Sequence, residues 1–262
     1  MNITIIQLDS GEDKESNIQK AQDYSIEAAK QGANIVCLPE CFLYQGDDKE
    51  KEIEQLSSNY ITAFQELARQ QHVHIVLGSI ALACKIPGKV TNTSLVINNK
   101  GEIVYRYDKI YLYTVERKDV TYRESDSVEP GSEPGVFELD GITMGIGICF
   151  DLRYPEYFRE LARQGAEIVF LPSNFRKVTG EIAWDVLTKA RAIENQLYFC
   201  ACGQTGNTGV KERCGNSRII SYDGTIISQM GQEEGIISAT LDPESLRTFR
   251  KEFPVLKQMK AH

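Results

Sequence analysis

The sequence predicts an α/β protein in which short buried strands alternate with amphipathic helices and the sheets are of mixed direction. Two observations predict this class. Apolar, β-branched runs alternate along the chain with longer stretches of helical periodicity. Three further pairs of runs meet at the turn sequences "NNKG", "LDG" and "YDG", which indicate hairpins. Because no linker or low-complexity stretch divides the 262 residues, we expect 1–262 to form a single domain.

The first half of the chain predicts three strands, two helices and a hairpin, in that alternating order. The first helix contains apolar residues at helical spacing, and Gly32 marks its expected end. The predicted elements are a strand at 2–8, a helix at 15–32, a strand at 33–40, a helix at 52–71, a strand at 73–82 and a hairpin at 93–108.

The second half repeats the alternation and adds two hairpins. Tyr154 and Pro155 precede a strongly amphipathic run, which is typical of a helix start because proline fits the first helical turn. The predicted elements are a hairpin at 135–150, a helix at 154–165, a strand at 166–173, a helix at 181–195, a strand at 196–204 and a hairpin at 217–228.

Composition and charge exclude two classes of partner. The chain carries 29 Lys and Arg against 37 Asp and Glu, a net charge of −8, whereas a nucleic-acid-binding domain is normally basic. No apolar run approaches the length of a membrane-spanning helix. The first residues, "MNITIIQLDSGEDKES", lack the basic and apolar regions of a signal peptide. We therefore expect a cytoplasmic protein with neither nucleic acid nor membrane as partner.

The cysteines indicate free thiols. There are seven, an odd number, and several lie inside predicted strands, so a reducing compartment is expected. Cys200 and Cys202 are two apart on one strand and share a face. A structural zinc site would need a second pair of ligands at a matching spacing, which the sequence lacks. We expect no metal site, and core packing for these two thiols.

One segment of the sequence occurs twice in similar form. Residues 29–42, "AKQGANIVCLPECF", and 162–175, "ARQGAEIVFLPSNF", agree at nine of fourteen positions. Each copy holds a helix end, a glycine, a buried strand and a proline at the strand exit. Ligands of α/β sheets bind beyond the carboxyl ends of strands. Glu40 and Asn174, which follow these two ends, are therefore candidates for a shared site.

Cys149 ends another predicted strand, in the stretch "GIGICFDLRYPE" at 145–156. A free cysteine there has two interpretations: a packed core thiol, or a nucleophile presented at a sharp turn. A nucleophilic thiol needs a base or a nearby cation. The three histidines are poor candidates for that base, since His262 is terminal and His72 and His74 adjoin a predicted strand.

A carboxylate and a lysine offer an alternative to histidine. Glu40 follows the apolar run "IVCLP", and Lys109 lies among aromatic residues in "YRYDKIYLY". Each of these groups, like Cys149, is a polar residue at the edge of an apolar strand. Taken singly, each is also compatible with a surface charge or a core thiol. Taken with the internal repeat, they suggest one catalytic set.

Several motifs together resemble the nitrilase superfamily of carbon–nitrogen hydrolases, and most closely its Nit-type amidases, which include ω-amidases and deaminated-glutathione amidases. The resemblance covers nearly the whole chain. The motifs are "LPE" at 38–40, "YDKIYL" at 107–112 and "GICFDLRYPE" at 147–156, with further similarity in "NTSLVINNKGEI" at 92–103, "YRESDSVEPG" at 122–131 and "LTKARAIENQLY" at 187–198.

The resemblance implies an αββα four-layer sandwich with two mixed β-sheets and a Glu-Lys-Cys triad. Glu40 would be the general base, Lys109 would hold the oxyanion, and Cys149 would attack. The backbone N–H of Phe150 would be a second oxyanion donor. Glu124, in "YRES", matches the family's second glutamate, which orients the lysine and the leaving group.

The implied reaction is hydrolysis of a small, non-peptide amide to a carboxylate and ammonia through a thioester, without metal or organic cofactor. Asn174, Phe175 and Tyr113 are candidates for the substrate pocket. The resemblance also implies a homodimer or larger homo-oligomer, with the C-terminal segment at about 243–262 extending towards a partner subunit. The alternatives are an N-carbamoyl compound or a nitrile as substrate, or an inactive protein that binds or assembles.

Two positions depart from the Nit-type pattern. Ala183, in "GEIAW", and Asn216, in "GNS", stand where the family usually has histidines. Because these motifs border the family's pocket, the chemistry is implied more firmly than the substrate.

Overall fold

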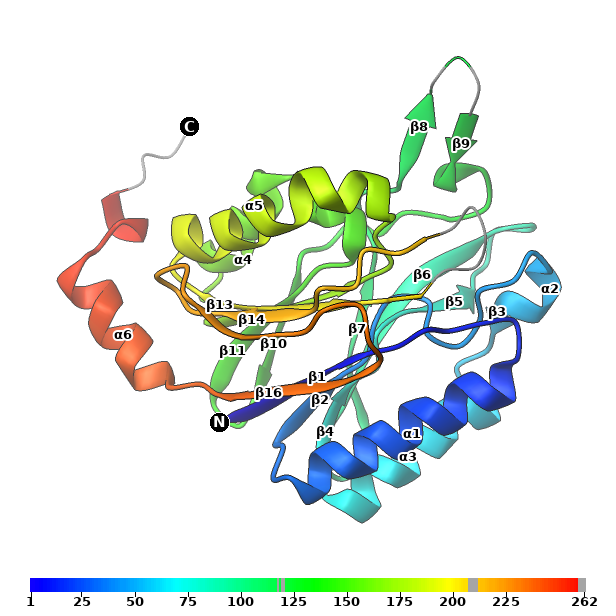
Figure 1. Ribbon diagram of the computed structural model, residues 1–262, viewed down its shortest axis with the longest axis horizontal. Coiled ribbons are helices and arrows are strands. Elements are labelled where there is room, and N and C mark those ends of the chain that lie inside the picture. The colour runs from blue at the N-terminus through cyan, green and yellow to red at the C-terminus, as the bar shows by residue number, and fades with distance from the viewer. Residues whose placement is uncertain (117, 119–120, 207–211, 259–262) are drawn as a thin grey trace.

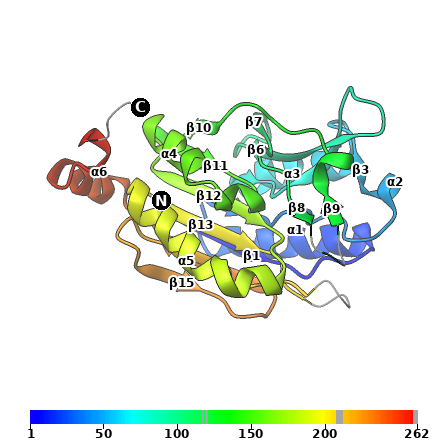
Figure 2. The same ribbon diagram turned by 90° about the horizontal axis from the view of Figure 1, so that it is seen from above.

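The computed structural model describes residues 1–116, 118, 121–206 and 212–258. Two β-sheets pack face to face, and helices cover both outer faces (Figures 1 and 2). Helices α1 (Lys14–Lys30) and α3 (Asn59–Gln71) lie on one side, and α4 (Pro155–Arg163) and α5 (Lys177–Asn195) on the other. The layers therefore follow the order αββα, which confirms the predicted four-layer sandwich.

The first sheet has eight strands of mixed direction. Its spatial order is β16-β1-β2-β4-β6-β5-β3, and β7 pairs with β6 outside that path. Strands β1, β2 and β4 are parallel, whereas β16 and β6 run antiparallel to their neighbours. The bounds are Gly235–Thr240 (β16), Asn2–Gln7 (β1), Ile35–Cys37 (β2), His74–Val76 (β4), Val90–Ile97 (β6), Ile80–Ala83 (β5), Ile53–Glu54 (β3) and Ile103–Asp108 (β7).

The second sheet has six strands in the order β10-β11-β12-β13-β14-β15. Its centre, β11 to β13, is parallel, and antiparallel hairpins complete both edges. The bounds are Gly135–Leu139 (β10), Ile142–Ile146 (β11), Ile168–Ser173 (β12), Tyr198–Gly203 (β13), Arg218–Ile220 (β14) and Ile226–Gln229 (β15). A separate two-stranded hairpin, β8 (Thr114–Glu116) with β9 (Thr121–Arg123), projects from the sandwich (Figure 1).

Local sequence explains where the main helices begin. The side chains of Asp13 and Ser58 accept hydrogen bonds from the free backbone N–H groups at the starts of α1 and α3. Proline opens α4 and also α6 (Pro243–Glu252), where its missing N–H costs nothing. The remaining helical segments are short: α2 (Lys49–Glu52) and the 3₁₀ turns Glu124–Asp126, Cys149–Arg153 and Leu256–Gln258.

The core between the sheets is fully buried. Cys202 lies there with its Sγ atom 3.0 Å from the carbonyl oxygen of Ile6 and 3.3 Å from that of Cys37. Cys200 and Cys202 both have 0% of their surface exposed. They are the core thiols that the sequence predicts.

Two predicted elements differ from the structure. The strand expected at 73–82 is broken at Gly78, so that β4 and β5 are separate strands. Gly78 has φ of +40°, and a Cβ atom there would lie 2.1 Å from the carbonyl oxygen of Pro39, so only glycine fits. The helix expected at 52–71 begins only at Asn59, because Ile53–Glu54 pairs with β5 as strand β3.

Other elements, including helix α6, were not predicted or begin elsewhere. Helix α5 starts at Lys177, four residues before the expected start at 181. Strand β16 and the β8–β9 hairpin have no counterpart in the prediction. In the described part of the chain, none of the helices is both long and apolar enough to span a membrane.

Candidate active site

Four strand ends bring the predicted catalytic residues together. Glu40 follows β2, Lys109 follows β7, Cys149 follows β11, and Asn174 follows β12. The strands belong to both sheets, so the site lies where the two sheets meet. The two copies of the internal repeat thus end at one place, as the sequence predicts: the backbone N–H of Asn174 donates to Oε2 of Glu40 over 2.7 Å.

Cys149 occupies a sharp turn at the end of its strand. Its φ of +47° is in the left-handed region, which is unfavourable for a residue with a side chain, and it opens the 3₁₀ turn Cys149–Arg153. Ile148 before it is still extended, with φ of −123°. The turn therefore directs the backbone away from the sheet at the thiol, as in a nucleophile elbow.

Asp151 fixes this turn from below. Its carboxylate accepts hydrogen bonds from the backbone N–H of Ile148 at 2.7 Å and of Tyr111 at 2.9 Å, and from the Tyr107 hydroxyl at 2.8 Å. Asp151 has none of its surface exposed. One buried side chain thus ties the cysteine turn to the segment that carries Lys109.

Lys109 joins two glutamates inside the protein. Its Nζ atom lies 3.0 Å from Oε1 of Glu40, and 3.1 and 3.0 Å from the two carboxylate oxygens of Glu124. Exposure of the three residues is only 2%, 3% and 8%. A buried charge needs partners of this kind, because isolated burial of an ion is costly. An ammonium has three N–H donors, so one remains available when each glutamate takes one.

Asn92 completes the cluster and was given no role in the sequence analysis. Its Nδ2 atom donates to Oε1 of Glu40 at 3.0 Å and to Oε1 of Glu124 at 3.2 Å. The backbone carbonyl oxygen of Asn92 accepts from the backbone N–H of Lys109 at 2.9 Å. Two carboxylates in close contact would repel each other. Asn92 and Lys109 both stand between them as hydrogen-bond donors.

The site is net negative when both glutamates are ionised, and this governs the thiol. Burial, the largest cause, and the charge of Glu40 raise the pKa of Cys149 well above its ordinary value, although Lys109 acts in the opposite direction. For Lys109, burial lowers the pKa, but the charges of Glu40 and Glu124 outweigh it, so the pKa lies well above its usual range. The resting state is therefore a neutral thiol beside a charged lysine.

Two neighbours also act on the Cys149 thiol in opposite directions, since Glu40 raises its pKa and the Asn174 backbone N–H lowers it. Glu40 Oε1 accepts from Lys109 and Asn92, and Oε2 accepts from the Asn174 backbone N–H. The Glu40 carboxylate is therefore the candidate acceptor for the thiol proton.

The pocket candidates lie beside this centre in different surroundings. The Tyr113 ring meets the Phe150 ring edge to face, with centroids 5.2 Å apart, and the backbone N–H of Tyr113 donates to Glu124 over 2.6 Å. Phe175 is only 5% exposed and packs between Trp184 and the Arg153 guanidinium. Asn174 is half-buried.

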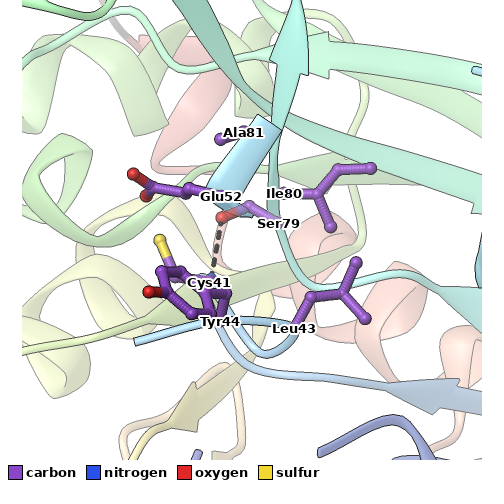
Figure 3. A pocket seen from close by; sticks show the side chains of 7 residues that line it. All are labelled: Cys41, Leu43, Tyr44, Glu52, Ser79, Ile80 and Ala81. Carbon is purple, nitrogen blue, oxygen red and sulfur yellow. Dashed lines mark hydrogen bonds between the residues drawn. The ribbon is translucent and has the colours of Figure 1, made fainter. Parts of the chain in front are cut away.

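A small cavity adjoins the site next to Glu40. Figure 3 shows its lining, in which the backbone N–H of Cys41 donates to the Ser79 hydroxyl over 3.2 Å and Glu52 and Tyr44 complete the polar part. Its volume is about 10 Å³, comparable to a single water molecule. This cavity cannot hold an amide substrate. Within the described residues, no group of three or more His, Cys, Asp or Glu is arranged to hold a metal ion.

The missed residues gave weak signals in the sequence. Asn92 precedes the apolar part of a hairpin strand. If residues are paired one to one outward from the hairpin turn, Asn92 falls opposite Asp108 and not opposite Lys109. The bulge at Val96/Ile97 shifts the pairing by one residue, to Thr93 opposite Asp108. Asp151 follows the cysteine closely, and its acidic type in a buried turn was the available signal.

Comparison with known proteins identifies the family. The model of the carbon-nitrogen hydrolase family matches residues 2–251. Deaminated glutathione amidase of Yersinia enterocolitica is 34% identical over 98% of this chain and 92% of its own length. Omega-amidase NIT3 of Saccharomyces cerevisiae is 31% identical over 98% of this chain and 92% of its own.

Solved structures agree with this match. The crystal structure of Saccharomyces cerevisiae Nit3, a member of branch 10 of the nitrilase superfamily, superposes with a TM-score of 0.88 at 30% identity, covering 98% of this chain and 96% of that one. The C. elegans NitFhit protein gives a TM-score of 0.91 at 29% identity over 99% of this chain. This chain spans 65% of the NitFhit chain. The family match and the shared fold together show that the chain belongs to the carbon–nitrogen hydrolase family.

Proposed function

We propose that this protein hydrolyses a small, non-peptide amide to a carboxylate and ammonia, with Cys149 as nucleophile, Glu40 as general base and Lys109 as oxyanion donor. The observation that carries the proposal is the buried ion cluster in which Lys109 contacts both Glu40 and Glu124 beside the cysteine turn. Two relatives are named deaminated glutathione amidase and omega-amidase, which supports an amide as the substrate.

Acylation begins with the neutral thiol. Glu40 accepts the proton of Cys149 as the sulfur attacks the amide carbon, because the raised pKa of the thiol disfavours a free thiolate. The developing oxyanion is held by the remaining N–H of Lys109 and by the backbone N–H of Phe150. Each such donor contributes about 3–4 kcal/mol to the transition state. The C–N bond then breaks, Glu40 returns the proton to nitrogen, and ammonia leaves.

Deacylation uses the same groups in the second half of the cycle. Glu40 takes a proton from a water molecule as the water oxygen attacks the thioester carbon. The C–S bond breaks, the sulfur recovers the proton, and the carboxylic acid is released and gives up its own proton to solvent as it becomes the carboxylate. Glu124 holds Lys109 in place through both steps. Tyr113, Asn174 and Phe175 border the acyl group.

Trapping of the acyl-enzyme tests this function. Ammonia release is first screened over ω-amides, short aliphatic amides, N-carbamoyl amino acids and nitriles, which also separates the two alternative substrate classes. Hydroxylamine added to the best amide should divert the acyl group into a hydroxamate, at the expense of the free acid, as its concentration rises. Acid quenching should place the acyl mass on the peptide that contains Cys149. Good turnover with neither product would exclude the thioester route.

The same chain is proposed to assemble as a homodimer or larger homo-oligomer. Helix α5 lies on the outer face of the sandwich (Figure 1). It carries a row of exposed apolar side chains. Val178, Ile182 and Val186 are 67%, 79% and 63% exposed and follow one another at helical spacing of four. Exposed apolar rows of this kind are typical of protein interfaces.

The oligomer is tested by light scattering coupled to size-exclusion chromatography. The wild type should elute at no less than twice the mass of one chain, and Ile182→Glu should lower that mass towards the monomer. Ile53→Glu, at a 43% exposed position of β3, is the control and should leave the mass unchanged. A wild-type monomer would contradict the proposal.

The C-terminal segment is proposed to take part in that assembly, with 1–262 forming one domain. Leu246 anchors α6 to the rest of the same chain and is fully buried. Arg250 donates to the carbonyl oxygens of Ala166 and Gln196 at 2.7 and 2.9 Å. Beyond this anchor, Phe253 is 60% exposed and available to a second subunit. The last part of the segment, 259–262, lies outside the described residues.

A cytoplasmic location is proposed on the state of the thiols. All seven cysteines lie in the described part of the chain, and each is a free thiol. Free thiols of this number are typical of a reducing compartment.

A further inference from the structure

Arg213 is a buried cation outside the catalytic cluster. Only 1% of its surface is exposed. Among the described residues, its shortest hydrogen bonds go to neutral oxygens, from Nε to Oδ1 of Asn174 at 2.9 Å and from Nη2 to Oε1 of Gln45 at 3.0 Å. Its contacts with the Thr205 carbonyl oxygen and with Asp9 are longer, at 3.5 and 3.6 Å. A buried arginine that serves only stability would be expected closer to a carboxylate.

Both neutral partners of Arg213 lead to Glu40. The backbone N–H of Asn174 donates to Oε2 of Glu40 over 2.7 Å. Gln45 donates from Nε2 to the carbonyl oxygen of Cys41, the residue that follows Glu40, over 3.0 Å. Asn174 also donates from Nδ2 to Oε1 of Gln45 over 3.1 Å. The hydrogen bonds among Arg213, Asn174 and Gln45 thus form a closed ring. Asn174 and Gln45 each connect this ring to the turn that holds Glu40.

The backbone holds Arg213 at this place. Its segment forms an antiparallel bridge with Arg176, just after the end of β12, and the backbone N–H of Cys214 donates to the carbonyl oxygen of Phe175 over 2.8 Å. The planar guanidinium can then address Asn174 and Gln45 at once. A lysine has a single charged nitrogen and cannot reproduce that fork.

We propose that Arg213 is a positioning residue for the catalytic base, holding Asn174 and Gln45 so that the Asn174 backbone N–H stays bonded to Oε2 of Glu40. The inference deepens the proposed function and rests on Glu40 acting as base. Without the clamp, the Asn174 side chain loses the donor to its Oδ1 atom and the Glu40 turn loses one of its supports. The proton path between sulfur and carboxylate then loses its alignment, and small misplacements of reacting groups are costly in rate.

The experiment compares wild type, Arg213→Met and Arg213→Lys in two assays. The first is steady-state amide hydrolysis, in which Arg213→Met should lower kcat by about ten- to a hundredfold with a KM change of less than about threefold. The second is alkylation of Cys149 by iodoacetamide as a function of pH, which needs no substrate. There the midpoint should move to higher pH by about half a unit, because the thiolate loses an aligned N–H donor.

Arg213→Lys, which keeps the charge without the fork, should lie between wild type and Arg213→Met in both assays. Asn174→Ala should give the same midpoint shift, and adding it to Arg213→Met should cause little further change, because the two residues act as one unit. Arg218→Met is the matched control. Arg218 is 3% exposed and pairs with Asp185 and the Asn216 carbonyl oxygen, away from Glu40.

The control should lose stability while keeping the wild-type alkylation midpoint. An unshifted midpoint in folded Arg213→Met and Arg213→Lys would overturn the proposal, as would additive effects of Arg213→Met and Asn174→Ala. If instead the wild type hydrolyses no amide, the proposed function fails. The alkylation arm still decides whether Arg213 positions the site.

Discussion

The backbone N–H of Asn174 and the Oε2 atom of Glu40 lie 2.7 Å apart, although 134 residues separate them. Each residue follows the strand of one copy of the internal repeat, and the two strands belong to different sheets. The contact therefore joins the two sheets at the site. It also gives Glu40, the proposed base, a backbone donor on its Oε2 atom.

Replacing the nucleophile should abolish turnover and leave the fold intact. Cys149→Ala removes the only atom that forms the thioester, so kcat should fall by at least about a thousandfold. Its melting temperature should stay near wild type, because Cys149 is a half-buried residue at the edge of the core and alanine removes only its sulfur atom. Ammonia release measures the effect. Cys84→Ala, at a half-buried position of another loop, should keep full activity. A Cys149→Ala variant with a tenth of wild-type activity would exclude it as nucleophile.

Replacing the base should separate catalysis from thiol reactivity. Glu40→Gln removes the proton acceptor, and ammonia release should become nearly undetectable. It also removes a negative charge that raises the pKa of Cys149. The midpoint of iodoacetamide alkylation should therefore move to lower pH while turnover is lost. Peptide mass mapping after alkylation at a series of pH values measures this. A midpoint that rises, or turnover like that of wild type, would remove Glu40 from its assigned role.

Asn92 should be required for rate more than for binding. Asn92→Ala leaves Glu40 and Glu124 with Lys109 as their shared donor, so their carboxylates should spread and kcat should fall by about ten- to a hundredfold. KM should change little, since Asn92 is buried and its side chain bonds to the two glutamates. Ser94→Ala on the same strand is the control, because its buried hydroxyl has no hydrogen-bond partner among the described residues. Equal kinetics for the two variants would contradict this role.

Asp151 should make stability depend on pH in an unusual direction. Burial, the largest cause, raises its pKa to about 6 from an ordinary 3.8, even though hydrogen bonds from Ile148 and Tyr111 act to lower it. The folded protein therefore binds a proton between pH 6 and 4 that the unfolded chain does not. This group's contribution to the free energy of unfolding is largest near pH 4 and falls as pH rises to 6, by on the order of 3 kcal/mol.

Urea unfolding of wild type and Asp151→Asn between pH 4.5 and 7.5 measures that contribution. The difference in free energy of unfolding, wild type minus variant, should decrease as the pH rises to 6 and stay level above it. Other titrating groups cancel in this difference because both proteins share them. A difference that increases with pH would show that the carboxylate is stabilised in its charged form.

Turn chemistry and periodicity predicted most of the elements correctly, and they failed where a distant contact decides the backbone. The strand at 73–82 has a continuous apolar pattern, yet Gly78 breaks it because the Pro39 carbonyl oxygen approaches too closely for any other residue. The sequence from Ile53 predicts part of a helix, but Ile53 and Glu54 pair with strand β5 instead. Neither partner is visible in a local window of sequence.

The sequence by itself determined the fold class, the internal repeat, the family resemblance and the candidates Glu40, Lys109, Glu124 and Cys149. These depend on residue type, on the order of motifs and on strand exits, which are local properties. Only the tertiary structure decided how those groups meet.

Tertiary structure placed Asn92 beside Lys109, through a bulge that shifts the hairpin register by one residue. It also buried Arg213 against Asn174 and Gln45, from three segments far apart in the chain. Register and burial depend on how the two sheets pack on each other. Neither a bulge nor a buried arginine produces a periodic pattern in the sequence. Each is stabilised by hydrogen-bond partners that only the folded chain brings close enough.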